Sequence, residues 1–203
     1  MASVVSICNL ALSNVGKENI NSLDEASSEA RACRQFYPHV RDILLQVYPW
    51  SFAGKSKSLA EVTNDKQGDW LHAYDYPTDC LKVRWIRPVH SNGGSGLVAY
   101  RPNGSDFEQP YAIEGGRIYC NISPAVLYYT VRETDPSRYP AMFIEALAWN
   151  LAVRLALPMT RDPKVRADAY QLAMQAQNAA AMVDANEVRE TSDHTSEFIA
   201  GRF

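Results

Sequence analysis

The side chains best suited to chemistry in this 203-residue chain are its histidines and cysteines. They are scattered along the sequence: His39, His72, His90 and His194, with Cys8, Cys33, Cys80 and Cys120. Imidazole and thiolate groups bind zinc, but structural zinc sites place them in close pairs such as C-x2-C or H-x3-5-H. Because no such pair occurs, we expect buried cysteines, histidines on the surface, and neither a bound metal nor a cofactor.

Motifs of nucleophilic, phosphate-binding and zinc-protease chemistry do not occur. The chain contains no G-x-S-x-G, no P-loop and no H-E-x-x-H. We therefore expect no enzymatic activity and assign no catalytic residue. The alternative is a small ligand-binding or hydrolytic module with a pocket between a sheet and a helical core. Its candidate residues lie close together only along the sequence: His72, Asp75, Asp79, Cys80 and His90.

A basic and aromatic stretch, LKVRWIRP (81–88), raises a second alternative, nucleic-acid binding through stacking and phosphate contacts. Its candidate residues are Lys82, Arg84, Trp85 and Arg87. An alternating strand explains the pattern equally well, with Leu81, Val83 and Trp85 facing a core and the cations facing solvent. We favour the strand, because the net charge is −3 and residues 51–138 carry as many acidic as basic side chains.

Two N-terminal helices are predicted from hydrophobic spacing. The first covers roughly residues 3–14, and Gly16 is a suitable C-terminal stop. The second runs from about residue 26 to Val47, with Pro38 inside it, where we expect a bend. The polar loop between them offers Ser and Asp side chains as N-caps. On the second helix, Arg41 and Asp42 are candidates for an ion pair or interface, but a solvated face is the favoured interpretation.

The residue composition and the hydrophobic pattern change after Trp50. From there to about residue 138, short runs rich in β-branched and aromatic residues alternate with Gly, Pro, Asn and Asp, which predicts a small antiparallel sheet or barrel. Gly115-Gly116 is suited to a hairpin turn. Pro49 should end the preceding helix. Trp50 and Phe52 should pack at the junction between helices and sheet.

Two further helices follow the β segment. The first is apolar nearly all round, with Phe143, Trp149 and Val153 beside its main face, so we expect it to be buried on more than one side and to end at Pro158. Asp162 and Pro163 should cap and start the last helix. Its predicted buried face has four-three spacing: Val165, Ala169, Leu172, Ala176, Ala179 and Val183.

These elements predict an α+β fold, with a four-helix core and a small antiparallel β domain inserted between helices 2 and 3. Residues 1–50 and 139–187 form the helical core, 51–138 form the inserted domain, and 188–203 form an extended C-terminal arm. The arm carries isolated large side chains in a polar setting. It either lies over its own core or docks into a partner and becomes ordered on binding. Its candidate docking residues are Phe198, Ile199, Arg202 and Phe203.

No membrane span or export signal is expected. The opening MASVVSICNLAL lacks the positive region and cleavage site of a signal peptide. The most apolar stretch, 141–157, is interrupted by Glu145, Asn150 and Arg154. We therefore expect a soluble intracellular protein whose cysteines stay reduced.

Three segments, taken together and in order, resemble the head–tail adaptor proteins of short-tailed phages, the tail tubular protein A family. They are ALSNVGKENINSLDEASSEARACRQFYPHVRDILLQVYPWSFA (11–53), YDYPTDCLKVRWI (74–86) and YPAMFIEALAWNLAVRLALPMT (139–160). The first is the most specific, and the resemblance covers nearly the whole chain apart from its last residues. Among phage connectors, the nearest rival is an all-helical head-completion protein, and the β-rich segment 51–138 argues against it.

The resemblance implies a structural virion protein in the neck of the particle, made in the host cytoplasm. Such proteins form a ring, typically a dodecamer, between the portal protein and the tail nozzle, a tail tubular protein B-like partner. The resemblance further implies that the helical core meets its ring neighbours, that the arm grips the portal, and that the inserted sheet faces the nozzle. DNA would pass through the lumen during ejection without specific binding. No membrane is involved.

Overall fold

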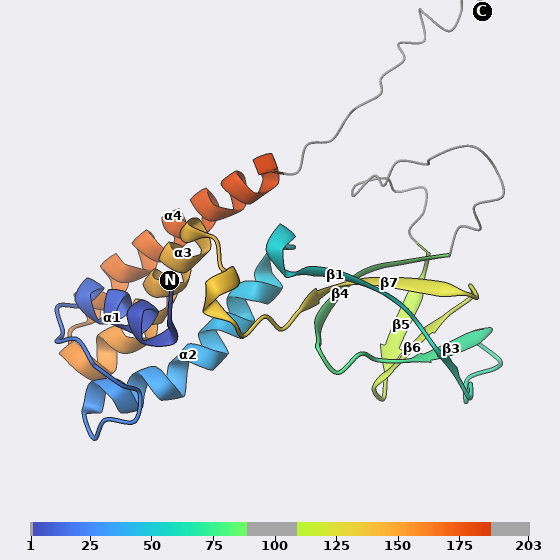
Figure 1. Cartoon of the computed structure of the whole chain (residues 1–203), viewed down its shortest axis with the longest axis horizontal. Coiled ribbons are helices and arrows are strands. Elements are labelled where there is room, and N and C mark those ends of the chain that lie inside the picture. The colour runs from blue at the N-terminus through green and yellow to red at the C-terminus, as the bar shows by residue number, and fades with distance from the viewer. Residues whose placement is uncertain (1, 89–108, 188–203) are drawn as a thin grey trace, which may run out of the picture.

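The computed structural model describes residues 2–88 and 109–187, and its two parts lie side by side along the long axis of the molecule (Figure 1). Within this described part, the helical core consists of α1 (Val4–Asn14), α2 (Ser28–Val47), α3 (Ala141–Thr160) and α4 (Pro163–Glu187). The β domain is inserted between α2 and α3. The fold is therefore α+β, as the sequence predicts.

The helix ends follow the predicted capping residues. Gly16, just beyond α1, adopts a φ of 69°, a left-handed conformation that costs glycine little. Ser27 caps α2, since its hydroxyl accepts the backbone N–H of Ala30. Asp162 accepts the N–H of Lys164 at 2.8 Å and so caps α4. These contacts confirm that polar side chains in the loops start the helices.

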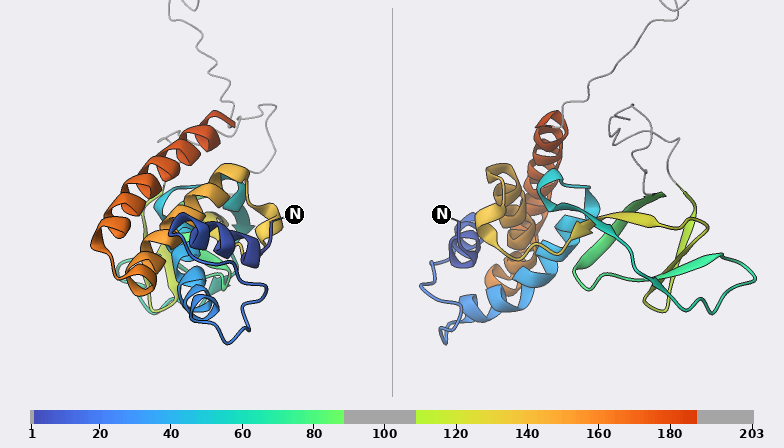
Figure 2. Two further views of the ribbon diagram at one scale, coloured as in Figure 1. Left: turned by 90° about the vertical axis from the view of Figure 1, so that its left-hand side faces the viewer. Right: turned by 45° about the vertical axis from the view of Figure 1, so that its right-hand side comes forward.

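Helix α3 is the central helix of the core, and Figure 2 shows α1 and α4 along different sides of it. It contacts α1, α2 and α4, which confirms the prediction that it is buried on more than one side. Its fully buried residues are Phe143, Ala146, Leu147, Ala148, Leu151, Ala152, Leu155 and Ala156. Among the described helices it is the one long and apolar enough to cross a membrane. Its central position in the core accounts for that composition.

The prediction that α3 ends at Pro158 is wrong. The helix continues to Thr160 and ends where Arg161 takes a left-handed φ of 56°, with its N–H bonded to the carbonyl of Leu157 at 3.0 Å. A proline removes one backbone donor, but its fixed φ is compatible with a helix, so it can be accommodated near the end. Helix α2 is likewise continuous through Pro38.

The β domain contains two antiparallel sheets, of strand orders β1-β7-β4 and β2-β3-β6-β5. The described strands are β1 (Gly54–Ser58), β2 (Glu61–Val62), β3 (His72–Asp75), β4 (Cys80–Pro88), β5 (Tyr111–Glu114), β6 (Arg117–Cys120) and β7 (Ala125–Val131). Gly115 and Gly116 have φ values of 58° and 75°, which confirms the hairpin turn between β5 and β6. Strand β3 was not predicted, because four residues give too short a pattern. Residues 89–108 of the predicted β segment lie outside the described residues.

The predicted alternation in β4 is wrong. Irregularities in register occur between Cys80 and Lys82 and between Val83 and Trp85. The buried residues of β4 are therefore Cys80, Val83 and Ile86, three apart, in place of the expected Leu81, Val83 and Trp85. A bulge inserts a residue that the partner strand does not match, so the following side chains change faces. As a result, Arg84 turns toward the helical core and not toward solvent.

The predicted buried face of α4 is also wrong in part. The buried residues are Ala169, Ala173, Ala180 and Asp184. The side chains of Leu172 and Val183 are 40% and 43% exposed. Within the described chain, α4 packs mainly against α3. A single neighbour covers only a narrow stripe of a helix, and the flanking apolar residues remain on the surface.

Candidate functional site

The most elaborate arrangement of side chains lies where the helical core meets the β domain, at residues 48–54, which we call the junction. The predicted junction residues Pro49, Trp50 and Phe52 lie here. Trp50 is 1% exposed, and its indole Nε1 donates to the carbonyl of Leu44 at 2.8 Å. Its ring meets Phe143 edge-on at a centroid distance of 5.1 Å. Pro49 is exposed and follows the end of α2, whereas Trp50 fills the space beneath the connection to β1.

Helix α4 reaches the junction through Asp184. Its carboxylate accepts the backbone N–H of Ser51 at 3.0 Å and the Ser51 hydroxyl at 2.7 Å. Asp184 is 7% exposed, so these bonds replace water for a largely buried charge. They also satisfy the free N–H at the start of the short 3-10 turn Ser51–Ala53. The last turn of α4 is therefore fixed to the beginning of the inserted domain.

Arg84 of β4 fixes the junction from the other side. Its guanidinium donates to the carbonyl of Trp50 at 2.6 Å and, through Nε, to the hydroxyl of Thr130 at 3.0 Å. The guanidinium passes directly over Gly54, where a Cβ atom would lie 2.9 Å from Arg84 Nη1. A side chain at this position would require the end of Arg84 to shift. Asp184, Ser51, Trp50 and Arg84 therefore link α4, the connection and the sheet.

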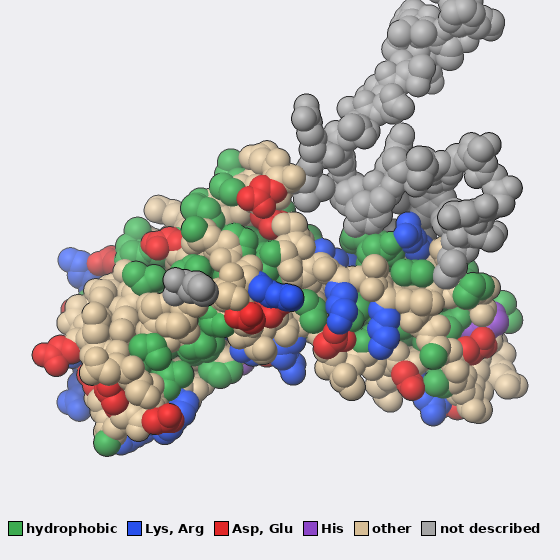
Figure 3. All heavy atoms as spheres, in the orientation of Figure 1, with side chains coloured by type: hydrophobic (Ala, Val, Ile, Leu, Met, Phe, Trp, Pro, Cys, Tyr) green, Lys and Arg blue, Asp and Glu red, His purple; other side chains and the backbone are tan. Residues whose placement is uncertain are grey.

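Further cations join β4 and β7 to α2. Lys82 Nζ donates to the carbonyl of Gln46 at 2.8 Å, in the last turn of α2, where the helix dipole favours positive charge. The carboxylate of Asp42 bridges Arg41, at 2.7 Å, and Arg132, at 3.1 Å. Figure 3 shows positive side chains gathered on this face where the two parts meet. Arg41 is 9% exposed, so the predicted solvated face at Arg41 is wrong and its ion-pair alternative holds.

The return from sheet to helix is held by Glu133. Its carboxylate accepts the N–H of Asp135 and pairs with Arg138 at 2.9 Å, while its backbone carbonyl accepts the hydroxyl of Tyr139 at 2.8 Å. Burial raises the pKa of Tyr139 well above its usual range, so this hydroxyl remains a donor. Both connections between core and insertion are thus fastened by specific hydrogen bonds.

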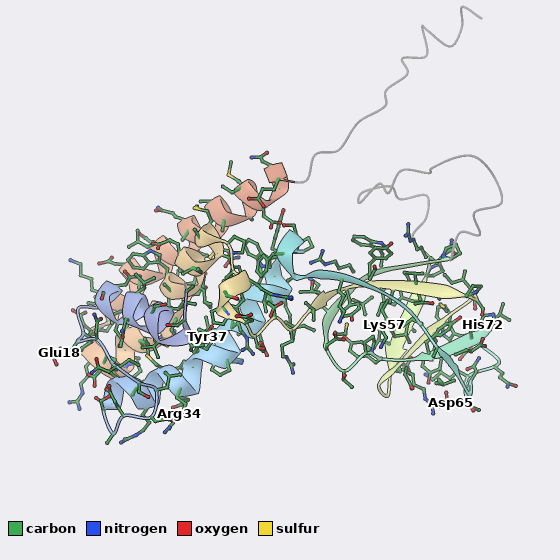
Figure 4. The ribbon with its side chains drawn as sticks, in the orientation of Figure 1. Glu18, Arg34, Tyr37, Lys57, Asp65 and His72 are labelled. Carbon is green, nitrogen blue, oxygen red and sulfur yellow. The ribbon has the colours of Figure 1, made fainter. Side chains whose placement is uncertain are left out.

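The residues of the ligand-binding alternative do not share one set of partners. His72 Nδ1 donates to Glu61 at 2.7 Å, and that bond lowers the pKa of the Glu61 carboxyl. Figure 4 shows His72 near the end of the β domain that points away from the helical core. Asp79 instead pairs with Lys55 at 2.6 Å and accepts the hydroxyl of Tyr129 at 2.9 Å.

The other candidate residues of the ligand-binding alternative do not form a shared site either. Asp75 is exposed, and Cys80 is buried, where desolvation raises the pKa of its thiol. His90 lies outside the described residues. In the part of the chain that the structure describes, no group of three or more His, Cys, Asp or Glu side chains could hold a metal ion. The four cysteines are buried free thiols.

The cations proposed for nucleic acid are occupied by protein contacts. Lys82 and Arg84 bind the junction, as described above. The guanidinium of Arg87 lies over the ring of Tyr128, 4.7 Å from its centroid, and Tyr128 stacks on Trp85 at 5.1 Å. These contacts fit a structural role of the LKVRWIRP strand.

The surface of α4 is a second candidate site, of the protein-docking kind. From Ala169 to Val183 the helix carries no charged residue. Five large apolar side chains on α4 are 40–67% exposed: Tyr170, Leu172, Met174, Met182 and Val183. These exposed apolar side chains make this part of α4 a candidate for protein association. The predicted portal-docking residues Phe198, Ile199, Arg202 and Phe203 follow this helix in sequence, and they lie outside the described residues.

A scan against protein-family models finds no match to this chain, and a search of curated proteins finds none either.

The sequence analysis missed Asp184, Ser51 and Gly54. For Asp184 a signal existed, because it is the one charged residue between Asp168 and Glu187. A lone carboxylate within an otherwise uncharged stretch of a helix indicates a specific partner. The identity of the partner, Ser51, could not be found from the sequence, because 133 positions separate it from Asp184.

Proposed function

We propose that this chain is a structural adaptor of a phage head–tail connector, a subunit of a ring that joins the portal to the tail nozzle and forms part of the DNA ejection channel. The ring is typically a dodecamer in the family that the chain resembles, and we adopt that number. The protein belongs in this proposal to the neck of the virion and is made in the host cytoplasm. It has no catalytic activity.

The resemblance to tail tubular protein A is the observation that carries the proposal. The three resembling segments contribute to the helical core and to its contacts with the β domain. Segment 11–53 contains α2 and the junction, 74–86 contains Lys82 and Arg84, and 139–160 contains α3. The resembling segments therefore include residues that hold the β domain on the helical core, namely Trp50, Lys82 and Arg84. An adaptor that meets different partners at its two ends requires such a fixed relation.

The exposed face of α4 supports the proposal independently of the resemblance. A helix with an uncharged surface and several exposed apolar side chains is suited to a neighbouring protein, and the C-terminal arm begins directly after it. Weak binding by one arm becomes strong when many arms around a ring act together, because each bound arm raises the effective concentration of the others.

The charge distribution is compatible with a channel that DNA crosses without binding. The net charge is −3, and Lys82, Arg84, Arg87 and Arg132 make contacts within the protein. Phosphate contacts by free cations would add affinity through counterion release and would slow passage. The adaptor therefore needs no basic lumen.

Native mass spectrometry with the portal ring of the same phage tests the proposal. The full chain should add to the portal as a stoichiometric ring, and a chain ending at Asn186 should fail to add while keeping its fold. Asp184 is retained in the shorter chain, so the junction is unchanged. If the full chain neither binds the portal nor forms a multimer, the proposed function is wrong.

A further inference from the structure

Two helices of the core, α1 and α4, present surfaces without charge. Residues 2–16, which include all of α1, contain no Asp, Glu, Lys or Arg, and neither does 169–183 of α4. By contrast, α2 carries Glu29, Arg31 and Arg34 in its first two turns. The ion pairs of the described β domain likewise leave charge on its surface, as Lys66–Glu114 and Arg117–Asp65 show.

The surface of α4 is apolar enough to require a neighbour. Tyr170 and Met174 lie one turn apart on one flank of its buried alanine stripe, and Leu172 and Val183 lie on the other flank. Helix α3 covers only the stripe between them. Each flank places apolar area in water that a second protein could remove, at roughly 25 cal/mol per Å² buried.

The exposed residues of α1 are uncharged, like the surface of α4. They are Ser6, Leu10 and Ser13, which are spaced four and three apart and therefore share one face. Leu10 is 44% exposed and offers an apolar contact, and the serines on either side are small enough for a helix to approach closely. Neither surface would bury an unpaired charge against the other, which is the costliest defect an interface can have.

The positions of α1 and α4 in the core determine how copies of the chain could associate through them. Both pack against α3, they lie along different sides of it, and they share no substantial contact with each other (Figure 2). A contact between α4 of one copy and α1 of another uses two different surfaces, so each copy keeps one of each free for a further neighbour. Such a heterologous contact repeats around an axis and closes into a ring if the rotation permits.

We propose that α4 of each subunit packs against α1 of the next subunit and that this contact builds the ring. The inference rests on the proposed function and specifies its lateral interface. The occupant of the α4 face is a second copy of this chain, and the arm that follows α4 is left free for the portal.

The first test replaces Leu10 by Lys, which places a charge at the centre of the α1 surface. We expect this variant to fold normally and to lose at least tenfold in the amount of ring formed on the portal, measured by native mass spectrometry. Val47→Lys is the matched control, because Val47 is 53% exposed on α2, outside both surfaces, and should assemble normally. Normal assembly of the Leu10→Lys variant would overturn the inference.

A second test identifies the partner surface directly. Leu172 and Met174 lie on opposite flanks of α4, so a photo-crosslinking amino acid is placed at each in a separate variant. One of the two variants should capture peptides from residues 2–16 of the neighbouring subunit in the assembled ring, and it identifies the flank that α1 covers. Capture of α4 by α4 would indicate a two-fold contact, and capture of the portal would indicate a different occupant; either result overturns the inference. The proposed function would survive both, because it fails only if the unmodified chain forms no ring.

Discussion

The carboxylate of Asp184 accepts both the backbone N–H and the hydroxyl of Ser51, at 3.0 Å and 2.7 Å, although 133 positions separate the two residues. The bond joins the last helix of the core to the first residues that leave the core. It lies three residues before the end of α4 at Glu187. The last turn of α4 and the start of the β domain are thus joined to each other.

Replacing Asp184 by Asn should lower the free energy of unfolding by about 1–2 kcal/mol. The amide keeps one acceptor oxygen but loses the charge that strengthens bonds to the Ser51 N–H and hydroxyl, and such charge-assisted bonds contribute roughly 1.5–3 kcal/mol. Urea denaturation measures the change. Asp168→Asn, on the exposed side of the same helix, should change stability by less than about 0.5 kcal/mol. Equal effects of the two variants would contradict a specific role of Asp184.

A methyl group at position 54 should disturb the junction. In Gly54→Ala, the new Cβ would lie 2.9 Å from Arg84 Nη1 and 3.2 Å from the carbonyl oxygen of Ser51. The guanidinium must then move and weaken its bond to Trp50, at a cost of about 1 kcal/mol. The control is Gly68→Ala, because nothing lies within 4 Å of the added atom there. Thermal unfolding of the two variants should differ, with the Gly54 variant less stable.

Trp50→Phe should destabilise the core. Trp50 is 1% exposed, and the variant loses its bond to the Leu44 carbonyl and leaves a cavity where the larger ring lay. We expect a loss of about 2–4 kcal/mol in unfolding free energy. Trp70→Phe serves as control, since Trp70 is only partly buried in the β domain. A loss below about 1 kcal/mol at position 50 would show that the junction does not depend on the indole.

Asp79 should make stability depend on acidity. The bond from Lys55, with a further bond from the Tyr129 hydroxyl, holds the pKa of this carboxyl below its usual value. Its stabilising effect is therefore complete above the unfolded pKa, about 3.9, and is lost as the pH falls through the lower folded pKa. Asp79→Asn should flatten the decline in unfolding free energy below about pH 4. An unchanged pH profile would mean that the pair contributes nothing in solution.

The fold class and the order of elements could be predicted from the sequence because local signals were strong. The helix cap Asp162 and the turn Gly115-Gly116 act on their immediate neighbours, so the local sequence identifies them, whereas for α2 it indicated only that a Ser or Asp of the preceding loop would be the cap. The stop at Pro158 was predicted wrongly because a proline near the end of a helix removes one hydrogen bond and need not end the helix.

Features that depend on distant neighbours could not be predicted. Which flank of α4 is buried depends on α3 being its main neighbour, and the hydrophobic pattern alone does not contain that fact. The faces of β4 depend on irregularities that its pairing with β7 introduces. The predicted alternation therefore put Arg84 on the solvent face, whereas in the structure its guanidinium lies over Gly54.

The chain leaves the helical core along β1 and comes back along β7, and these two strands are paired antiparallel, with Gly54 opposite Thr130. Opposite residues in such a ladder lie roughly 5 Å apart, so the two cut points of the insertion are almost in contact. A short loop could span them. In evolutionary terms, such an insertion is suited to exchange, because a lineage could replace the β domain while the packing of the helical core stayed unchanged.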